Sequence, residues 1–249
     1  MIFIGIDDTD MLGSPGTGRL ARDLAEELAK SGAAVWAVTR HQLLVDSRIP
    51  FTSHNSSASI HIVDAGPAGL DGAWERAARF VSERAAPGSD PALCLGDAEN
   101  GLRLPLLEVF GRRAQTEVLD RRTAETIGAR SGVRLASLGG SGDGVIGALA
   151  AVGLAANGND GRFLQLGDIR SIGNTATVKE LLKAGIDAVW DLRGKNLADS
   201  RMIMTDGWVR PELINHNAIL VVEEKDGNVW EARNLVERRR RKSRTGDNA

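Results

Sequence analysis

The stretch that decides the fold is IFIGIDDTDMLGSPGTGRLARDL, at residues 2–24. Its apolar start, residues 2–6, predicts a buried strand, and three carboxylates follow at Asp7, Asp8 and Asp10. A glycine-rich turn comes next, and the leucines and alanines after it recur at the spacing of an amphipathic helix. Carboxylates placed this closely repel one another. The arrangement therefore indicates a ligand that neutralises them.

Strand and helix patterns alternate regularly over the following seventy or so residues. Strands are predicted at 33–45, 58–65 and 91–96, and an amphipathic helix at 72–86. Together with the opening stretch, this gives the order strand, helix, strand, strand, helix, strand. That order is typical of a ferredoxin-like or related layered fold. We therefore expect an α/β (α+β) protein with ferredoxin-like, kinase-like layers of mixed sheet and helices.

The second half of the chain predicts further helices at 117–130 and 144–156. The composition changes after NGNDG, where a capped helix and short antiparallel strands joined at KDGN are expected. We predict an α/β domain over residues 1–156 and a smaller α+β domain over 157–237. Residues 238–249 form a basic tail, predicted to be disordered.

Composition limits the class of protein. At 249 residues, with 42% hydrophobic and 26% charged residues, the chain is typical of soluble globular proteins, and it has no apolar run of membrane-spanning length. A single cysteine, Cys94, indicates a reducing cytoplasm and is expected to be a buried small hydrophobe. The six positive charges of RRRRKSR, on a chain of net charge −2, indicate either an RNA-binding arm or a solvated terminus.

The residues around the three aspartates suit phosphate and a divalent cation. Gly13, Gly16 and Gly18 allow backbone N–H groups to approach an anion, and Thr17 falls where the helix begins. Carboxylates suit Mg²⁺, which binds one or two of them together with phosphate oxygens. The alternative is ordinary turn and cap chemistry.

At this point the opening stretch resembles a known family, the archaeal tRNA(Ile2) 2-agmatinylcytidine synthetases, whose sequences begin GIDDTDS…GMCTTYLA. The resemblance implies a kinase-like module in which Asp7, Asp8 and Asp10 bind ATP and Mg²⁺. It also implies that Thr17 corresponds to a threonine that is phosphorylated from ATP.

Two later stretches extend the resemblance to about residue 155. RIPFTSHNSSASIHI is similar to the family's IPYKTRGNGAV, and GDGVIGALAAVGL is similar to its GRGLIGALAAVGA. With Gly-rich turns cradling phosphate, the expected nucleotide-binding residues are Gly13, Gly16, Gly18, Arg48, His54, Asn55, Ser56, Gly142, Asp143 and Gly144. In sequence, Arg48 and Arg19 are both near enough to supply the basic group that phosphoryl transfer needs.

The chain also departs from the family pattern. Gly16 and Gly18 replace its cysteine and second threonine, and His54 stands where an arginine is usual. The family continues into an oligonucleotide-binding barrel and a zinc ribbon, and one cysteine leaves no zinc ribbon here. The tRNA substrate is therefore less well supported than the ATP chemistry.

The leading interpretation is a cytoplasmic Mg-ATP-dependent phosphotransferase or ATP-cleaving ligase related to tRNA modification, with an unknown acceptor. One alternative is an aspartyl-phosphate phosphatase of haloacid dehalogenase type, with Asp8 as nucleophile, Asp10 as acid/base and LGDAEN as its late motif. Another is a non-catalytic nucleotide- or RNA-binding protein. The polar set Asp97, Glu99 and Asn100 is expected to form a turn, and the histidines show no metal-ligand spacing.

Overall fold

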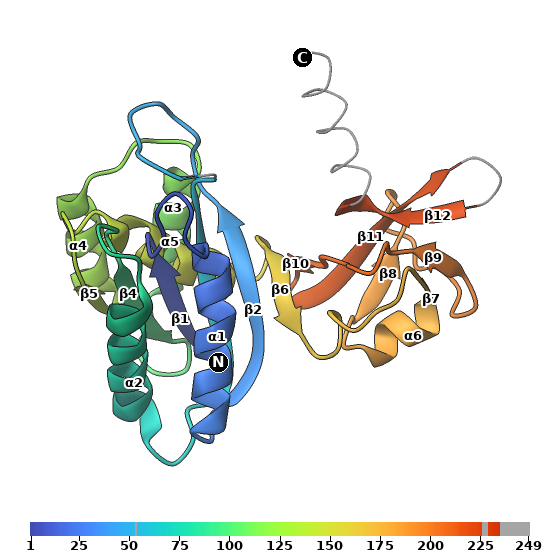
Figure 1. Cartoon of the computed structure of the whole chain (residues 1–249), viewed down its shortest axis with the longest axis horizontal. Coiled ribbons are helices and arrows are strands. Elements are labelled where there is room, and N and C mark those ends of the chain that lie inside the picture. The colour runs from blue at the N-terminus through green and yellow to red at the C-terminus, as the bar shows by residue number, and fades with distance from the viewer. Residues whose placement is uncertain (53, 226–228, 235–249) are drawn as a thin grey trace. The chain divides into compact units, whose positions relative to one another are not determined.

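The computed structural model describes residues 1–52, 54–225 and 229–234, and the chain divides into two units, Met1–Leu164 and Gln165–Ala249 (Figure 1). The sequence places this boundary after residue 156, whereas the structure places it after Leu164. The predicted basic tail, residues 238–249, lies outside the described residues.

The N-terminal unit is built on an antiparallel sheet. Its strand order is β5-β4-β1-β3-β2, and every neighbouring pair is antiparallel. The strands are β1 (Ile2–Asp7), β2 (Ala34–Gln42), β3 (Ser56–Asp64), β4 (Ala92–Asp97) and β5 (Arg134–Ser137). The order β4-β1-β3-β2, with one helix after β1 and one after β3, confirms the ferredoxin-like pattern.

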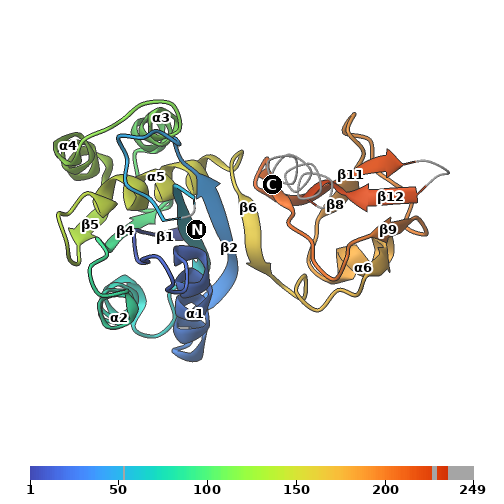
Figure 2. The same cartoon turned by 45° about the horizontal axis from the view of Figure 1, so that its top comes forward.

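Helices cover both faces of this sheet, as Figure 2 shows. One face carries α1 (Thr17–Lys30) and α2 (Gly69–Arg84), which pack on alternate strand residues such as Ile4 and Ile60. The other carries α3 (Leu104–Ala114), α4 (Arg121–Ser131) and α5 (Gly144–Asn157). Buried Cys94 lies on this second face, as the sequence predicts, and burial raises the pKa of its thiol.

The small residues of α5 let this helix lie directly on the sheet. A Cβ on Gly5 of β1 would lie 2.2 Å from the carbonyl oxygen of Ala148, and one on Gly153 would lie 2.1 Å from that of Leu107 in α3. No side chain fits in either gap. This confirms the prediction that the glycines and alanines of residues 144–156 form a closely packed helix.

The C-terminal unit is a small α+β assembly that contains both parallel and antiparallel pairs. Strand β6 (Arg162–Leu166) leads into it, followed by β7 (Thr175–Thr177), α6 (Val178–Lys183), β8 (Ala188–Trp190), β9 (Met202–Met204), β10 (Glu212–Ile214), β11 (Asn217–Lys225) and β12 (Val229–Ala232). The β11–β8 and β12–β9 pairs are parallel, which gives the mixed sheet character that was expected. Helix α6 begins with the predicted cap, since Thr177 and Glu180 form a capping box.

Some elements were not predicted from the sequence, among them α3, β5 and β6. Helix α4 is shorter than its predicted range, because Asp120 caps it and residues 117–119 precede the helix. The predicted KDGN turn falls largely on residues 226–228, outside the described ranges. Within those ranges, no helix has the length and apolar character required to cross a membrane.

Candidate functional site

The predicted acidic residues lie at one edge of the N-terminal sheet, where several loops meet. Strand β1 ends at Asp7, which pairs with Ala92 at the start of β4. Beyond it, the backbone N–H of Asp90 donates to the carbonyl oxygen of Asp8 at 3.1 Å. The hydroxyl of Thr52, in the loop before β3, donates to the Asp10 carboxylate at 2.7 Å. The antiparallel register thus gathers segments far apart in the sequence around the aspartates.

Asp10 and Thr17 form the centre of a hydrogen-bond network. Thr17 donates to the Asp10 carboxylate from its hydroxyl at 2.8 Å and from its backbone N–H at 3.2 Å. The same hydroxyl accepts hydrogen bonds from the hydroxyl and backbone N–H of Thr9. Thr17 is the first residue of α1 and is buried. In this arrangement Asp10 can take the proton of the Thr17 hydroxyl, but phosphorylation of Thr17 requires the bonds from Thr9 to break.

Asp7 and Asp8 lie in an electrostatically unfavourable environment. Burial raises the pKa of Asp7 to about 7, with a smaller contribution from the charges of Asp8 and Asp10. The pKa of Asp8 is raised to about 6, chiefly by burial and then by the negative charges of Asp90 and Asp10. The Asp7 carboxylate lies against α5, because a Cβ on Gly147 would be 1.6 Å from its Oδ2 atom. Close packing of α5 thus removes solvent from Asp7.

Asp90 is a site residue that the sequence analysis missed. Its carboxylate accepts hydrogen bonds from the backbone N–H groups of Gly142 (2.7 Å) and Asp143 (3.0 Å), and from the Ser141 hydroxyl. These donors belong to the second glycine-rich turn, which the sequence predicts to bind phosphate. In the structure they donate to Asp90 instead. The signal was available, since Asp90 directly precedes the predicted strand 91–96, and Asp7 pairs with Ala92 at the start of that strand.

The basic residue next to this turn is Arg121 of α4. Its guanidinium donates to the carbonyl oxygen of Ser141 at 2.8 Å and pairs with Glu125 at 2.6 Å. By contrast, Arg48 is paired with Asp46 through two hydrogen bonds of 2.8 Å, and its side chain is 70% exposed. Arg19 pairs with Asp23 along α1. Neither arginine chosen from the sequence is bonded to the aspartates, whereas Arg121 contacts the loop that holds Asp90.

The glycines of the first turn lie beside open space. A Cβ on Gly13 or Gly16 would have no atom within 4 Å, although Gly13 itself needs glycine because its φ is +89°. Gly18 instead faces Leu164, and Gly144 faces the carbonyl oxygen of Asp90. The backbone at residues 13 and 16 is therefore accessible to a ligand, while Gly18 and Gly144 are closely packed.

The serine-rich loop before β3 is largely engaged in its own structure. The Asn55 side chain donates to the carbonyl oxygen of Leu44 at 2.7 Å, and the Ser56 hydroxyl accepts from Arg40 at 2.8 Å. His54 is exposed. Thr52, in the same loop, hydrogen-bonds Asp10 of the cluster.

The residues at this edge of the sheet suit Mg²⁺ only in combination with other ligands. Among the described residues, no three His, Cys, Asp or Glu side chains are arranged to hold a metal ion by themselves. Magnesium, however, commonly uses only one or two carboxylates and takes its remaining ligands from phosphate and water. The raised pKa values of Asp7 and Asp8 show uncompensated negative charge, which fits a cation bound together with a nucleotide.

The opposite edge of the sheet carries the polar set Asp97, Glu99 and Asn100, and it is a turn, as predicted. Asp97 accepts from the Glu99 backbone N–H at 3.0 Å and from the Asn100 side chain at 2.5 Å. Asp97 pairs with Ile2 at the start of β1, whereas Asp8 follows the end of that strand. The LGDAEN motif therefore cannot act with Asp8, which removes the structural basis of the phosphatase alternative.

Two histidines that look scattered in the sequence meet inside the N-terminal unit. The Thr39 hydroxyl lies 2.8 Å from the Nε2 atoms of both His41 and His61, and the Nδ1 atom of His41 lies 2.9 Å from Asp160. Burial opposes the charge of Asp160, but hydrogen bonds from His41 and Gln115 keep its pKa below the ordinary value. These buried groups satisfy one another and serve the core.

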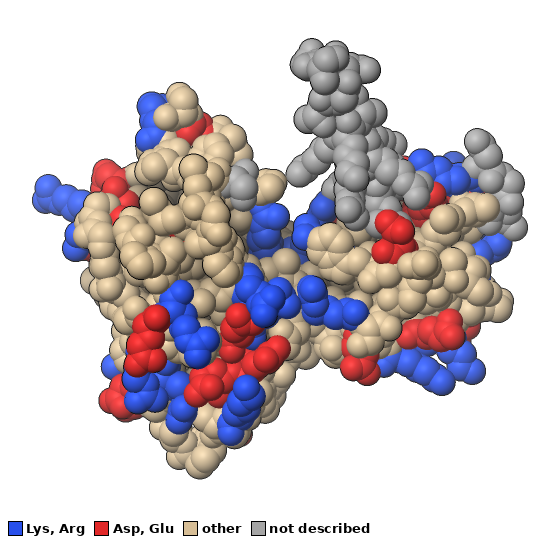
Figure 3. Space-filling view, viewed as in Figure 1, with Lys and Arg blue, Asp and Glu red and all other residues tan. Residues whose placement is uncertain are grey.

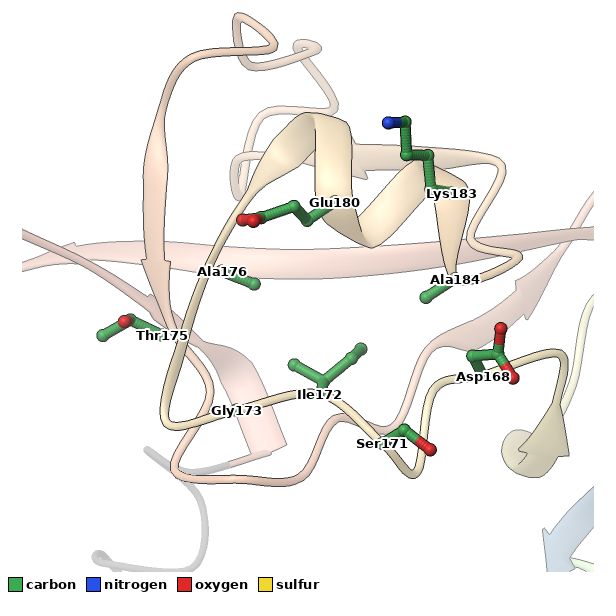
Figure 4. A pocket seen from close by; sticks show the side chains of 9 residues that line it. All are labelled: Asp168, Ser171, Ile172, Gly173, Thr175, Ala176, Glu180, Lys183 and Ala184. Atoms are coloured by element: carbon green, nitrogen blue, oxygen red, sulfur yellow. The ribbon is translucent and has the colours of Figure 1, made fainter.

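A separate hollow of about 310 Å³ lies in the C-terminal unit (Figure 4). Ile172, Ala176 and Ala184 supply its apolar part. Its charged groups are Asp168, Glu180 and Lys183. None of its lining residues was predicted to bind nucleotide.

Comparison with known proteins shows which solved structures this chain resembles. No protein-family model and no curated protein matches the sequence. Among solved structures, the TiaS–tRNA(Ile2)–ATP complex matches with 25% sequence identity and a TM-score of 0.51, over 61% of this chain. The chain is TiaS-like over this part of its length. A tRNA fluorescent labeling enzyme matches with 26% identity and a TM-score of 0.50, also over 61% of this chain.

The TiaS-like part corresponds to a fraction of those enzymes. The matches cover 36% of the TiaS chain in the ATP complex and 35% of the labeling enzyme, so this chain matches about a third of their length. A TiaS–tRNA(Ile2)–AMPCPP–agmatine complex matches equally, with 25% identity, a TM-score of 0.50 and 36% of that chain covered. The family resemblance carried by the opening stretch is thus confirmed.

Proposed function

We propose that this chain is an ATP-dependent, ligase-like enzyme of tRNA modification, whose N-terminal unit binds Mg-ATP at the edge formed by Asp7, Asp8 and Asp10. The observation that carries this proposal is the uncompensated charge of Asp7 and Asp8 beside the accessible backbone of Gly13 and Gly16. The likeness to TiaS structures that contain ATP and tRNA supports it.

Asp7, Asp8 and Asp10 would hold Mg²⁺, which neutralises phosphate charge when it is bound. The exposed backbone near Gly13 and Gly16 binds phosphate oxygens, and Arg121 supplies positive charge at the opposite loop. Thr17 is the acceptor in the phosphotransferase form of the proposal. Its oxygen bonds to the γ-phosphorus as the bond to the β-phosphate bridging oxygen breaks, ADP leaves, and Asp10 takes the hydroxyl proton.

The decisive experiment measures ATP consumption and intact protein mass with Mg-ATP, with and without bulk tRNA. We expect ATP consumption by the wild type and at least about a 100-fold loss in Asp8→Asn, since this carboxylate is a metal or phosphate-site group. Asp71→Asn is the matched control, because that carboxylate lies on α2 and is 87% exposed. No ATP binding or consumption under either condition would refute the proposal.

Fragmentation of the product separates the finer forms of the proposal. Added phosphate on Thr17, absent in Asp8→Asn, supports phosphoryl transfer to the protein. ATP consumption that depends on tRNA, without phosphate on Thr17, supports ligase-type activation of the RNA and excludes Thr17 as the acceptor. Phosphate on Asp8 would instead restore the phosphatase interpretation.

RNA binding through the basic tail is a separate part of the proposal, and it rests on the sequence RRRRKSR. Deletion of residues 238–249 is expected to weaken tRNA binding and to reduce its salt dependence, because each lost phosphate contact lowers the slope of log K against log salt by roughly 0.7 to 0.9. An unchanged slope in a binding titration would exclude this role for the tail.

A further inference from the structure

We propose that Phe51 stacks on the purine base of the nucleotide held at the aspartate edge, and so sets the preference for a nucleotide over other polyphosphates. This inference rests on the proposed function, because it deepens the account of the same site. Phe51 immediately precedes Thr52, whose hydroxyl bonds Asp10 at 2.7 Å. The aromatic ring is therefore carried on a loop that is fixed to the carboxylate cluster.

Phe51 stands out among the aromatic residues of the described ranges. It is 42% exposed, whereas Phe3, Phe110 and Phe163 are at most 4% exposed. No tryptophan among the described residues is exposed to a comparable degree, and the chain contains no tyrosine. An exposed aromatic ring keeps apolar surface in contact with water. The exposed ring belongs to the residue directly before Thr52, which hydrogen-bonds Asp10, and a flat apolar partner would cover it.

Other exposed apolar side chains follow the aspartates in the chain. Met11 and Leu12, which follow Asp10 directly, are 44% and 85% exposed. Figure 3 shows mixed charges over α1 and α2, while much of the surface above α1, where the loop after β1 lies, is uncharged. On this proposal these side chains, from two separate loops, form an apolar rim beside the carboxylates.

This combination fits a Mg-nucleotide better than a bare polyanion. The carboxylates of Asp8 and Asp90 repel phosphate unless a cation is bound with it. Because the carboxylates attract that cation, the phosphate end of a Mg-nucleotide belongs at the aspartates. The base then provides the apolar, flat end that the rim can cover. Every base has a π-face, and stacking on an aromatic side chain contributes measurably to nucleotide affinity.

The test measures binding of Mg-ATP and of Mg-tripolyphosphate by calorimetry for the wild type, Phe51→Ala, Phe51→Leu and Phe51→Trp. We expect Phe51→Ala to weaken ATP binding by about 5- to 150-fold and to leave tripolyphosphate binding unchanged. Phe51→Leu should also weaken ATP binding, because it is apolar without a π-face. Phe51→Trp should restore it, with quenching of the added tryptophan fluorescence by the base.

Val63→Ala is the matched control, since this exposed apolar residue lies near the other end of β3. The failures are distinguishable. Equal ATP affinity in the wild type and Phe51→Ala overturns the stacking inference and leaves the proposed function standing. An equal loss for ATP and tripolyphosphate also overturns it, because the effect then lies in the phosphate site. A wild type that binds neither ligand refutes the proposed function itself.

Discussion

Acidic side chains lie at both ends of the central strand β1, but the two groups differ in whether hydrogen bonds and opposite charges compensate their negative charge. At its start, Asp97 and Glu99 are satisfied by turn donors and by the N-terminal ammonium, 2.6 Å from Glu99. At its end, Asp7 and Asp8 are partly buried, and their pKa values are raised by desolvation and by neighbouring carboxylates. An acidic cluster points to a ligand when its charge is uncompensated, not when its residues are merely close in sequence.

The largest expected change in the free energy of unfolding comes from a mutation that disturbs the packing of α5 against Asp7. Gly147→Ala would place a Cβ 1.6 Å from Oδ2 of Asp7 and 2.9 Å from the Cβ of Asp7, so the Asp7 side chain or α5 must move. Overpacking of this kind costs about 1 to 3 kcal/mol or more in the free energy of unfolding. Denaturant titration measures it, with Gly16→Ala as control, because that position has open space and an ordinary φ of −69°. Equal stability of the two variants would show that α5 does not hold Asp7 in place.

A smaller effect concerns pH. The folded protein holds a proton on Asp7 up to a pH of about 7, whereas an unfolded carboxyl has a pKa near 3.8. The folded state therefore binds more protons, and the contribution of Asp7 to stability falls as the pH rises from about 4 to about 7. Above pH 7, Asp7→Asn should be more stable than the wild type by about 1 to 3 kcal/mol.

The measurement compares thermal unfolding of the wild type and Asp7→Asn from pH 5 to pH 8, with and without Mg-ATP. Mg-ATP should reduce the advantage of Asp7→Asn above pH 7, because a bound cation favours the ionised wild-type carboxylate. Parallel stability curves for the two proteins would show that Asp7 is ionised throughout and that its charge is compensated.

The smallest effect belongs to the opposite end of the strand. Glu99→Gln removes an ion pair whose glutamate side chain is 78% exposed, so it should change the free energy of unfolding by less than about 0.5 kcal/mol. Its ATP consumption should equal that of the wild type, unlike Asp8→Asn. A large loss of activity in Glu99→Gln would contradict the functional distinction between the two ends.

The sequence by itself determined the framework and predicted the centre of the candidate site. Alternating patterns predicted the strand and helix order through β4, and the small residues of α5 indicated close packing, since both signals depend on neighbours along the chain. The carboxylates Asp7, Asp8 and Asp10 were identified because one short segment contains them all. Helix α3 was missed, although Pro105 stands in its first turn, where proline is favoured.

Only the tertiary structure decided which distant groups join that centre. Asp90 meets Asp8 because β4 pairs antiparallel with β1, and Arg121 meets the second glycine turn because of the way α4 packs. The same folding gives the turn donors at Gly142 and Asp143 to Asp90. The pairing of Arg48 with Asp46 is instead local, since two positions separate them in the chain. Local sequence shows which groups are available, but register and packing determine which charges remain without a partner.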